Sequence, residues 1–258
     1  MKVVILCGGE GTRLREETEK KPKPLLPING HPILWHIMKI YSHYGFNEFV
    51  LCLGYKGYMI KDFFLNYETM TKDFTLQLAD TSKIEFHEKS REGDWKITFA
   101  ETGRHALTGA RLRKIRKYVG DTFMLTYGDG VADINIKTLL EFHKSHDRIA
   151  TVTGVHPPSR FGEMRVENDQ VLTFAEKPQI STGFINGGFL VLNQEIFDYL
   201  PDGDDLSLEG GPMASLAKDG QLRVYHHEGF WQPMDTYREF LILNKAWESG
   251  QAPWKVWD

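Results

Sequence analysis

The chain has 258 residues, of which 41% are hydrophobic and 26% are charged, and its formal net charge is −4. This length and composition are typical of a globular protein with a sizeable core, and they exclude a disordered chain and a small disulfide scaffold. The acidic balance disfavours a nucleic-acid-binding surface, and no run approaches the roughly 18 apolar residues of a membrane span, so we expect neither kind of partner.

The first quarter of the chain alternates short apolar strands with helices. Lys2–Cys7 is predicted to be a buried strand, because it is rich in β-branched residues and is followed by two glycines. Pro32 begins a predicted helix that Gly45 ends, Glu48–Leu53 is a second buried strand, and another helix is predicted from Tyr58. This order predicts a parallel sheet with helices on its faces.

The middle of the chain, about residues 74–102, follows a different pattern. Its residues alternate between apolar and polar and carry many charges, which predicts antiparallel strands with one wet face. Within it, Trp95–Phe99 is either a contact between copies of the chain or ordinary core. Later predicted elements are a basic helix at Arg111–Tyr118, strands at Phe123–Tyr127, Ile149–Val155, Val171–Phe174 and Gly188–Leu192, and helices from Ile136 and after Met234. We expect one α/β domain over residues 1–258, with a mixed, mostly parallel sheet and a small antiparallel excursion.

The two cysteines, Cys7 and Cys52, both lie in apolar runs. This favours buried, reduced thiols over a secreted disulfide framework. The apolar run Val3–Cys7 is too short for the hydrophobic region of a signal peptide. We therefore expect a cytoplasmic protein.

A glycine-rich loop, Gly8–Arg13, follows the first strand. Open α/β sheets bind ligands at the carboxyl ends of their strands, and glycines let backbone N–H groups approach phosphate oxygens closely. Arg13 can bind two phosphate oxygens, while Lys23 lies between two prolines that are expected to keep it extended. The stretch matches neither the dinucleotide-binding nor the P-loop glycine pattern. The alternative is a glycine turn with solvated lysines.

The sequence GGEGTRL, followed by KPKP, resembles the signature of the sugar-phosphate nucleotidylyltransferases. The stretches LGYKGYMIKDFF, TYGDGVADINIK, PPSRFGEM, INGGFLVLN, GFWQPMD and QAPWKVW extend the resemblance along nearly the whole chain. It implies a Rossmann-like α/β fold, a magnesium-dependent enzyme and a homo-oligomer. The chain is most similar to members that transfer CMP from CTP to α-D-glucose 1-phosphate. UTP or dTTP, another sugar 1-phosphate, or a non-catalytic relative are the alternatives.

The resemblance also implies a set of nucleotide contacts and two catalytic residues. In the family the glycine loop holds the nucleotide, and the arginine and lysine contact phosphates, which assigns those two roles to Arg13 and Lys23. A TG-x-R stretch contacts the nucleotide, although Arg111 could equally lie on the wet face of a helix. The nucleotide contacts expected in this way are Leu6, Cys7, Gly8, Gly9, Glu10, Gly11, Thr12, Arg13, Gly103, Thr108, Gly109, Arg111 and Gly128.

Two aspartates and a later segment complete the expected site. Asp129 follows a buried strand and Asp235 precedes the last helix. Carboxylates are suitable ligands for Mg²⁺. The alternative for Asp129 is a structural role in a turn, and the alternative for Asp235 is the N-cap of the helix. It is the resemblance that implies that both bind the magnesium ion. Asn186-Gly187 could also be a tight turn. The sugar-phosphate contacts that the resemblance implies are Glu176, Lys177, Asn186 and Gly187.

Overall fold

A computed structural model describes residues 1–11, 14, 18–157, 163–167, 170–175 and 183–258. In the order of the chain, with η for a 3₁₀ helix, its elements up to residue 118 are β1 (Lys2–Leu6), η2 (Lys23–Leu25), β2 (Pro27–Ile28), β3 (His31–Pro32), α2 (Ile33–His43), β4 (Glu48–Leu53), α3 (Gly57–Leu65), α4 (Tyr67–Thr71), β5 (Phe74–Leu76), β6 (Ile84–Phe86), β7 (Lys96–Glu101), α5 (Thr108–Lys114) and η3 (Arg116–Tyr118). The later elements are β8 (Thr122–Tyr127), β9 (Gly130–Ala132), α6 (Ile136–Lys144), β10 (Ala150–Val155), β11 (Glu163–Glu167), β12 (Gln170–Ala175), β13 (Ile185–Asn193), η4 (Gln194–Tyr199), α7 (Pro212–Lys218), β14 (Leu222–His227), β15 (Trp231–Pro233) and α8 (Tyr237–Glu248).

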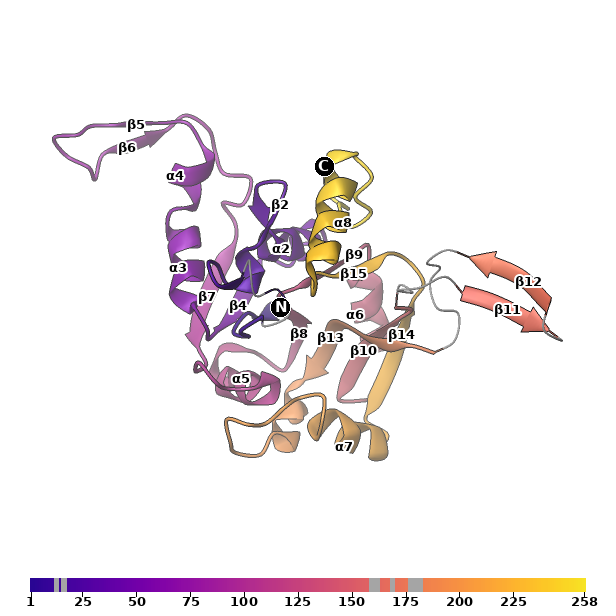
Figure 1. Ribbon diagram of the computed structural model, residues 1–258. Helices are drawn as coiled ribbons and strands as arrows, with labels where there is room; N and C mark the ends of the chain where they lie inside the picture. Colours follow the sequence, from indigo (N-terminus) through magenta and orange to yellow (C-terminus); the bar gives the residue numbers. More distant parts are fainter. Residues whose placement is uncertain (12–13, 15–17, 158–162, 168–169, 176–182) are drawn as a thin grey trace.

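A seven-stranded sheet in the order β14-β10-β13-β8-β1-β4-β7 forms the centre of the described molecule (Figure 1). Neighbouring strands are parallel except at β13, which runs antiparallel to both β10 and β8. Leu6 of β1 pairs with Cys52 of β4 and with Tyr127 of β8, so these three strands end at one level. The predicted mixed, mostly parallel sheet is confirmed.

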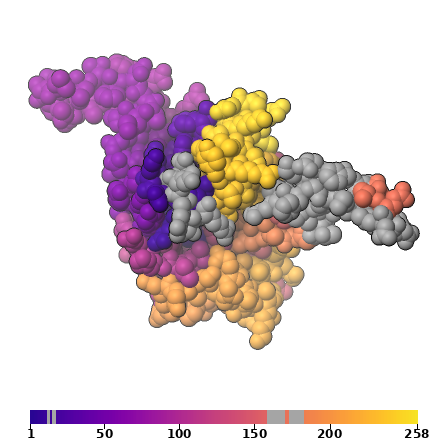
Figure 2. Space-filling view, viewed as in Figure 1, coloured from indigo at the N-terminus to yellow at the C-terminus, as the bar shows by residue number. Residues whose placement is uncertain are grey.

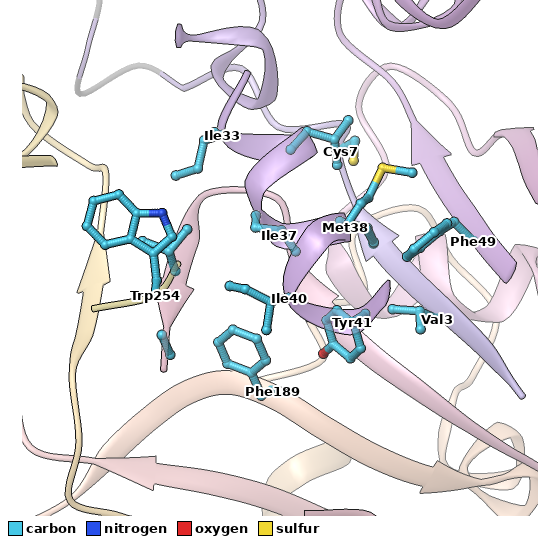
Figure 3. Close-up of a cluster of buried hydrophobic side chains, with 14 of the residues drawn as sticks. Val3, Cys7, Ile33, Ile37, Met38, Ile40, Tyr41, Phe49, Phe189 and Trp254 are labelled. Atoms are coloured by element: carbon cyan, nitrogen blue, oxygen red, sulfur yellow. The ribbon is translucent and has the colours of Figure 1, made fainter. Parts of the chain in front are cut away.

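The core lies on both faces of this sheet, because alternate residues of a strand point to opposite sides. Val3 and Ile5 belong to one buried cluster with the apolar face of α2 and Trp254, part of which Figure 3 shows. Val4 and Leu6 belong to a second cluster, together with residues of α5, η4 and α7. Helices therefore cover both faces, as the strand–helix alternation predicts.

The expected antiparallel excursion is smaller than predicted. β5 and β6 pair as an antiparallel hairpin, which stands out from the body of the molecule (Figures 1 and 2). The prediction was wrong for Lys96–Glu101, because this stretch is β7, a parallel partner of β4 in the central sheet. β7 is the last strand in the sheet order, and its half-exposed position explains the alternating pattern that suggested an antiparallel strand.

Two local predictions also need correction. Lys23 is not extended but begins η2, where the Leu26 N–H donates to the Lys23 carbonyl while Leu25 and Leu26 are buried in the core. The basic helix begins earlier than predicted, at Thr108, and its last turn is the separate 3₁₀ helix η3.

Both cysteines are free and fully buried, as predicted, and burial raises the pKa of each thiol. Among the described residues, no helix combines the length and apolar character that crossing a membrane would require.

Candidate active site

A cleft of about 250 Å³ lies where the order of the strands reverses, at the carboxyl ends of β1 and β8. The glycine loop leaves β1 there, and Gly128-Asp129 leaves β8. The cleft is lined by Leu6, Cys7, Gly8, Gly9, Gly11, Lys23, Pro24, Ala106, Leu107, Thr108, Arg111, Tyr127, Gly128 and Asp129. The structure therefore brings most of the predicted nucleotide contacts to one place.

Lys23 joins the two predicted metal ligands across this cleft. Its Nζ lies 2.7 Å from Asp129 Oδ2 and also donates a short hydrogen bond to Asp235 Oδ1. Only 11% of the Lys23 side chain is exposed. Burial by itself lowers the pKa of Lys23, but the two carboxylates raise it above its ordinary value, so the ammonium stays charged.

A short antiparallel ladder brings the two aspartates together although they are far apart in the sequence. Gly130 of β9 pairs with Pro233 of β15, and the Met234 N–H donates to the Asp129 carbonyl at 2.8 Å. The N-cap of α8 is Thr236, not Asp235, since Thr236 and Glu239 form a capping box. The Asp235 carboxylate can therefore turn toward Asp129, and two convergent carboxylates are a donor set that suits Mg²⁺.

Arg111 lines the cleft but has its donors turned toward the protein. Only 4% of this residue is exposed. Its guanidinium donates to the carbonyls of Gly8, Leu53 and Gly103 at 2.8–2.9 Å, and to the Thr102 hydroxyl at 2.8 Å. A Cβ at Gly8 would lie 2.1 Å from Arg111 Nη1, so Gly8 is a glycine because Arg111 packs against it. Arg111 thus fixes the floor of the cleft.

Some predicted nucleotide contacts lie beside the cleft instead of lining it. Gly109 packs against Leu206, where an added Cβ would lie 2.9 Å from the leucine Cγ. Gly103 has a φ of +98° and places its carbonyl toward Arg111. Glu10 is exposed. Thr12 and Arg13 lie outside the described residues.

A second, smaller cavity of about 40 Å³ adjoins the cleft and contains both described sugar-phosphate candidates. It is lined by Thr126, Tyr127, Asp129, Gly130, Asn186, Gly187, Gly188, Trp231 and Pro233. Asn186-Gly187 belongs to β13, so the tight-turn alternative is wrong. Trp231 Nε1 donates to the Gly187 carbonyl at 2.7 Å and holds this part of the strand. Glu176 and Lys177 lie outside the described residues.

Sequence reasoning missed Tyr127, which lines both cavities. It is the last residue of β8 and directly precedes Gly128-Asp129. Its position at the carboxyl end of a predicted strand, where open α/β sheets bind ligands, could have identified it as a site residue. Pro24, Ala106 and Leu107 were also missed, and their apolar side chains carry no chemical signal in the sequence.

An open α/β sheet with a glycine loop, a lysine and two carboxylates at its strand ends defines a nucleotide-binding enzyme of the phosphate-transferring kind. Residues 2–248 match the nucleotidyl transferase family, and the chain belongs to that family.

Its relatives include glucose-1-phosphate cytidylyltransferase of Salmonella typhi, which is 48% identical over 260 residues and 100% of both chains. Another is the probable glucose-1-phosphate cytidylyltransferase of Bacillus subtilis, 52% identical over 258 residues, again covering 100% of both. The fold is similar to a crystal structure of UDP-glucose pyrophosphorylase complexed with UDP-glucose. The TM-score is 0.67 at 16% identity, and the match covers 96% of this chain and 98% of that one.

Proposed function

We propose that this chain transfers CMP from CTP to α-D-glucose 1-phosphate, giving CDP-glucose and pyrophosphate. The full-length relatives named for this activity support the substrates. The observation that carries the chemistry is the Lys23 ammonium between the carboxylates of Asp129 and Asp235 at the edge of the cleft.

The reaction is one in-line displacement at phosphorus. A phosphate oxygen of glucose 1-phosphate forms a bond to the α-phosphorus of CTP while the bond from that phosphorus to the bridging α–β oxygen breaks. Pyrophosphate leaves with that electron pair, and no covalent enzyme intermediate is needed. Catalysis then consists of positioning two anions and neutralising their charge.

Different residues of the chain position the two substrates and neutralise their charge. Lys23 bridges the attacking and the attacked phosphates, and Arg13 steadies the pyrophosphate. On the sugar side, Lys177 orients the sugar phosphate, while Glu176 and Asn186 bind sugar hydroxyls. Asn186 is supported in this role because it lines the smaller cavity with its amide held by the Gly188 N–H at 2.9 Å.

Asp129 and Asp235 would hold Mg²⁺, because their two carboxylates converge at the edge of the cleft. When bound, the ion neutralises charge on the α-phosphate and makes the phosphorus easier to attack. The two carboxylates also orient Lys23, so the cationic part of the site is built before substrates arrive.

We also infer a single-domain, cytoplasmic homo-oligomer. Two free, buried cysteines support a reducing compartment. Apolar side chains that are largely exposed on α3, α4 and the β5/β6 hairpin support association, since Leu65 is 80% exposed, Met70 79% and Leu78 84%.

The test is pyrophosphate release from CTP, UTP, dTTP, ATP and GTP in turn, with glucose 1-phosphate and Mg²⁺. We expect strong release with CTP only. Release with another nucleotide alone would retain the mechanism and overturn the base assignment. If no pyrophosphate is released with any of the five nucleotides or with a panel of sugar phosphates, although a nucleotide binds, the result would favour a non-catalytic protein. The Asp129→Asn variant serves as the inactive control.

A further inference from the structure

The Glu209 carboxylate accepts hydrogen bonds from three hydroxyl groups. The Tyr127 hydroxyl donates to Oε1 at 2.5 Å, and the hydroxyls of Thr108 and Ser207 donate to Oε2 at 2.7 and 2.6 Å. Glu209 lies in the loop between η4 and α7, far from these partners in the sequence except for Ser207. A carboxylate only accepts hydrogen bonds, so all three protons must point toward it.

Tyr127 stands between the two cavities of the site. It lines the cleft with the glycine loop and the smaller cavity with Asn186. Its ring packs directly on the backbone of Gly188, where an added Cβ would lie 2.6 Å from the ring. The tyrosine is therefore fixed at its ring by β13 and at its hydroxyl by Glu209.

The direction of the Tyr127 proton decides what the hydroxyl offers to the smaller cavity. Because the proton points to Glu209, the oxygen presents its lone pairs, and Asn186 Nδ2 approaches it at 3.4 Å. Asn186 Oδ1 is already bound to the Gly188 N–H.

Thr108 is oriented in the same way on the nucleotide side. Its hydroxyl accepts the Leu208 N–H at 2.9 Å and donates to Glu209. Both hydrogen bonds tie the start of α5, which lines the cleft, to the loop that carries Glu209. One carboxylate thus holds a residue of the nucleotide cleft and a residue of the smaller cavity together.

We propose that Glu209 is a positioning residue that couples the nucleotide and sugar subsites, through Thr108 on one side and Tyr127 with Asn186 on the other. This inference rests on the proposed function, because it assigns the two cavities to the two halves of a nucleotide sugar. Glu209 itself acts only through the side chains that it orients.

The test compares Glu209→Gln, Tyr127→Phe and the double variant in the full-length protein. Calorimetric dissociation constants are measured for CTP and for CDP-glucose, and KM and kcat are measured separately. Glutamine keeps the size of the side chain but offers one acceptor oxygen, so the hydroxyls lose their common partner. We expect Glu209→Gln to weaken CDP-glucose binding about tenfold or more and to raise both KM values, with a smaller change in kcat.

The Tyr127→Phe variant separates the two arms of the network. It should weaken CDP-glucose binding more than CTP binding, and the double variant should bind CDP-glucose within about twofold of Glu209→Gln, because the two residues act as one unit. Asp202→Asn, in the same loop but paired with Arg113, is the matched control and should behave like the natural protein.

Three results would overturn the proposal. The first is unchanged CDP-glucose binding in a folded Glu209→Gln protein. The second is a double variant whose loss of CDP-glucose affinity equals the product of the losses in the two single variants, and the third is an Asp202→Asn variant that binds CDP-glucose as weakly as Glu209→Gln does. Circular dichroism and the Tm establish folding, and Tyr127→Phe alone still tests the coupling if Glu209→Gln does not fold. Failure of the natural protein to release pyrophosphate from CTP would count against the proposed function, whereas the binding comparison tests Glu209 with whichever nucleotide binds.

Discussion

Lys23 is the residue on which the charge balance of the site depends. Its ammonium has an acidic partner on each side, and little of its side chain reaches solvent. Phosphate oxygens entering the cleft would find this cation already placed at the edge of the glycine loop. A positive group that is held in position stabilises developing charge without reorganising, which is why it acts most strongly in the transition state.

The Lys23→Ala variant should lose at least about two orders of magnitude in kcat/KM, corresponding to ~2.7 kcal/mol or more of transition-state stabilisation. Lys21→Ala is the matched control, because Lys21 belongs to the same loop and is exposed. The measurement is steady-state pyrophosphate release. A near-natural rate for Lys23→Ala would remove this lysine from the mechanism.

At the scale of elements, Arg111 connects the ends of β1 and β4 with the segment that precedes α5. Its guanidinium donates to the carbonyls of Gly8, Leu53 and Gly103. The Gly8 and Leu53 carbonyls also accept the backbone N–H groups of Tyr55 and Thr102. Burial lowers the pKa of Arg111. Several hydrogen bonds from one buried charged donor stabilise the fold even where an acceptor has a second partner, so the effect of removing Arg111 should appear in the stability of the fold.

We expect Arg111→Met to lower the free energy of unfolding by about 3 kcal/mol or more, measured by urea denaturation. The control is Arg116→Met, since Arg116 is exposed in η3. The opposite pattern, unchanged stability with a large loss of CTP affinity, would show that Arg111 is a direct ligand contact, as its sequence motif suggests.

The close approach of β13 to β8 gives a second prediction at this scale. Gly188 has a φ of +82°, and a side chain there would meet the Tyr127 ring at 2.6 Å. Gly183 is a matched control, because its φ of +89° is similar and an added Cβ would meet no atom of the described residues within 4 Å. Gly188→Ala should destabilise by about 1–3 kcal/mol more than Gly183→Ala in thermal or urea unfolding. Equal losses would mean that backbone strain alone is responsible.

The sequence predicted most of the elements around the site, because strands such as Glu48–Leu53 are apolar throughout and end at glycines. It did not predict β14, an edge strand with a polar, half-exposed sequence that lacks this signal. The contact between Lys23 and the two aspartates joins residues more than 100 positions apart, and residue type alone does not encode such a meeting. Glu209 was missed for the same reason.

At the scale of the whole molecule, the β5/β6 hairpin exposes apolar side chains that a monomer would leave in contact with water. It stands out from the body (Figure 2). Leu78, which lies between its two strands, is largely exposed. The Trp95–Phe99 stretch, in contrast, packs in part against the core through Trp95, Ile97 and Phe99. Any contact between copies is therefore expected to involve the hairpin and α4 more than β7.

We expect the Met70→Lys, Leu78→Asp double variant to shift the protein to a smaller assembly in light scattering coupled to gel filtration, because charge on a buried apolar contact prevents association. Leu172→Asp, also an exposed apolar position but in β12, is the control. A natural protein that is already monomeric at micromolar concentration would contradict the homo-oligomer.

The pairing of Lys23 with both aspartates also bears on the sequence of events during turnover. In the free protein the lysine is occupied, and a sugar phosphate arriving alone meets two carboxylates of its own sign. A divalent cation bound together with CTP would balance the charge of these carboxylates, and the Lys23 ammonium would then be available to phosphates. We therefore expect an ordered sequential mechanism with CTP first and CDP-glucose released last. CDP-glucose should then inhibit competitively against CTP and not against glucose 1-phosphate, and tight binding of glucose 1-phosphate to the free protein would contradict this order.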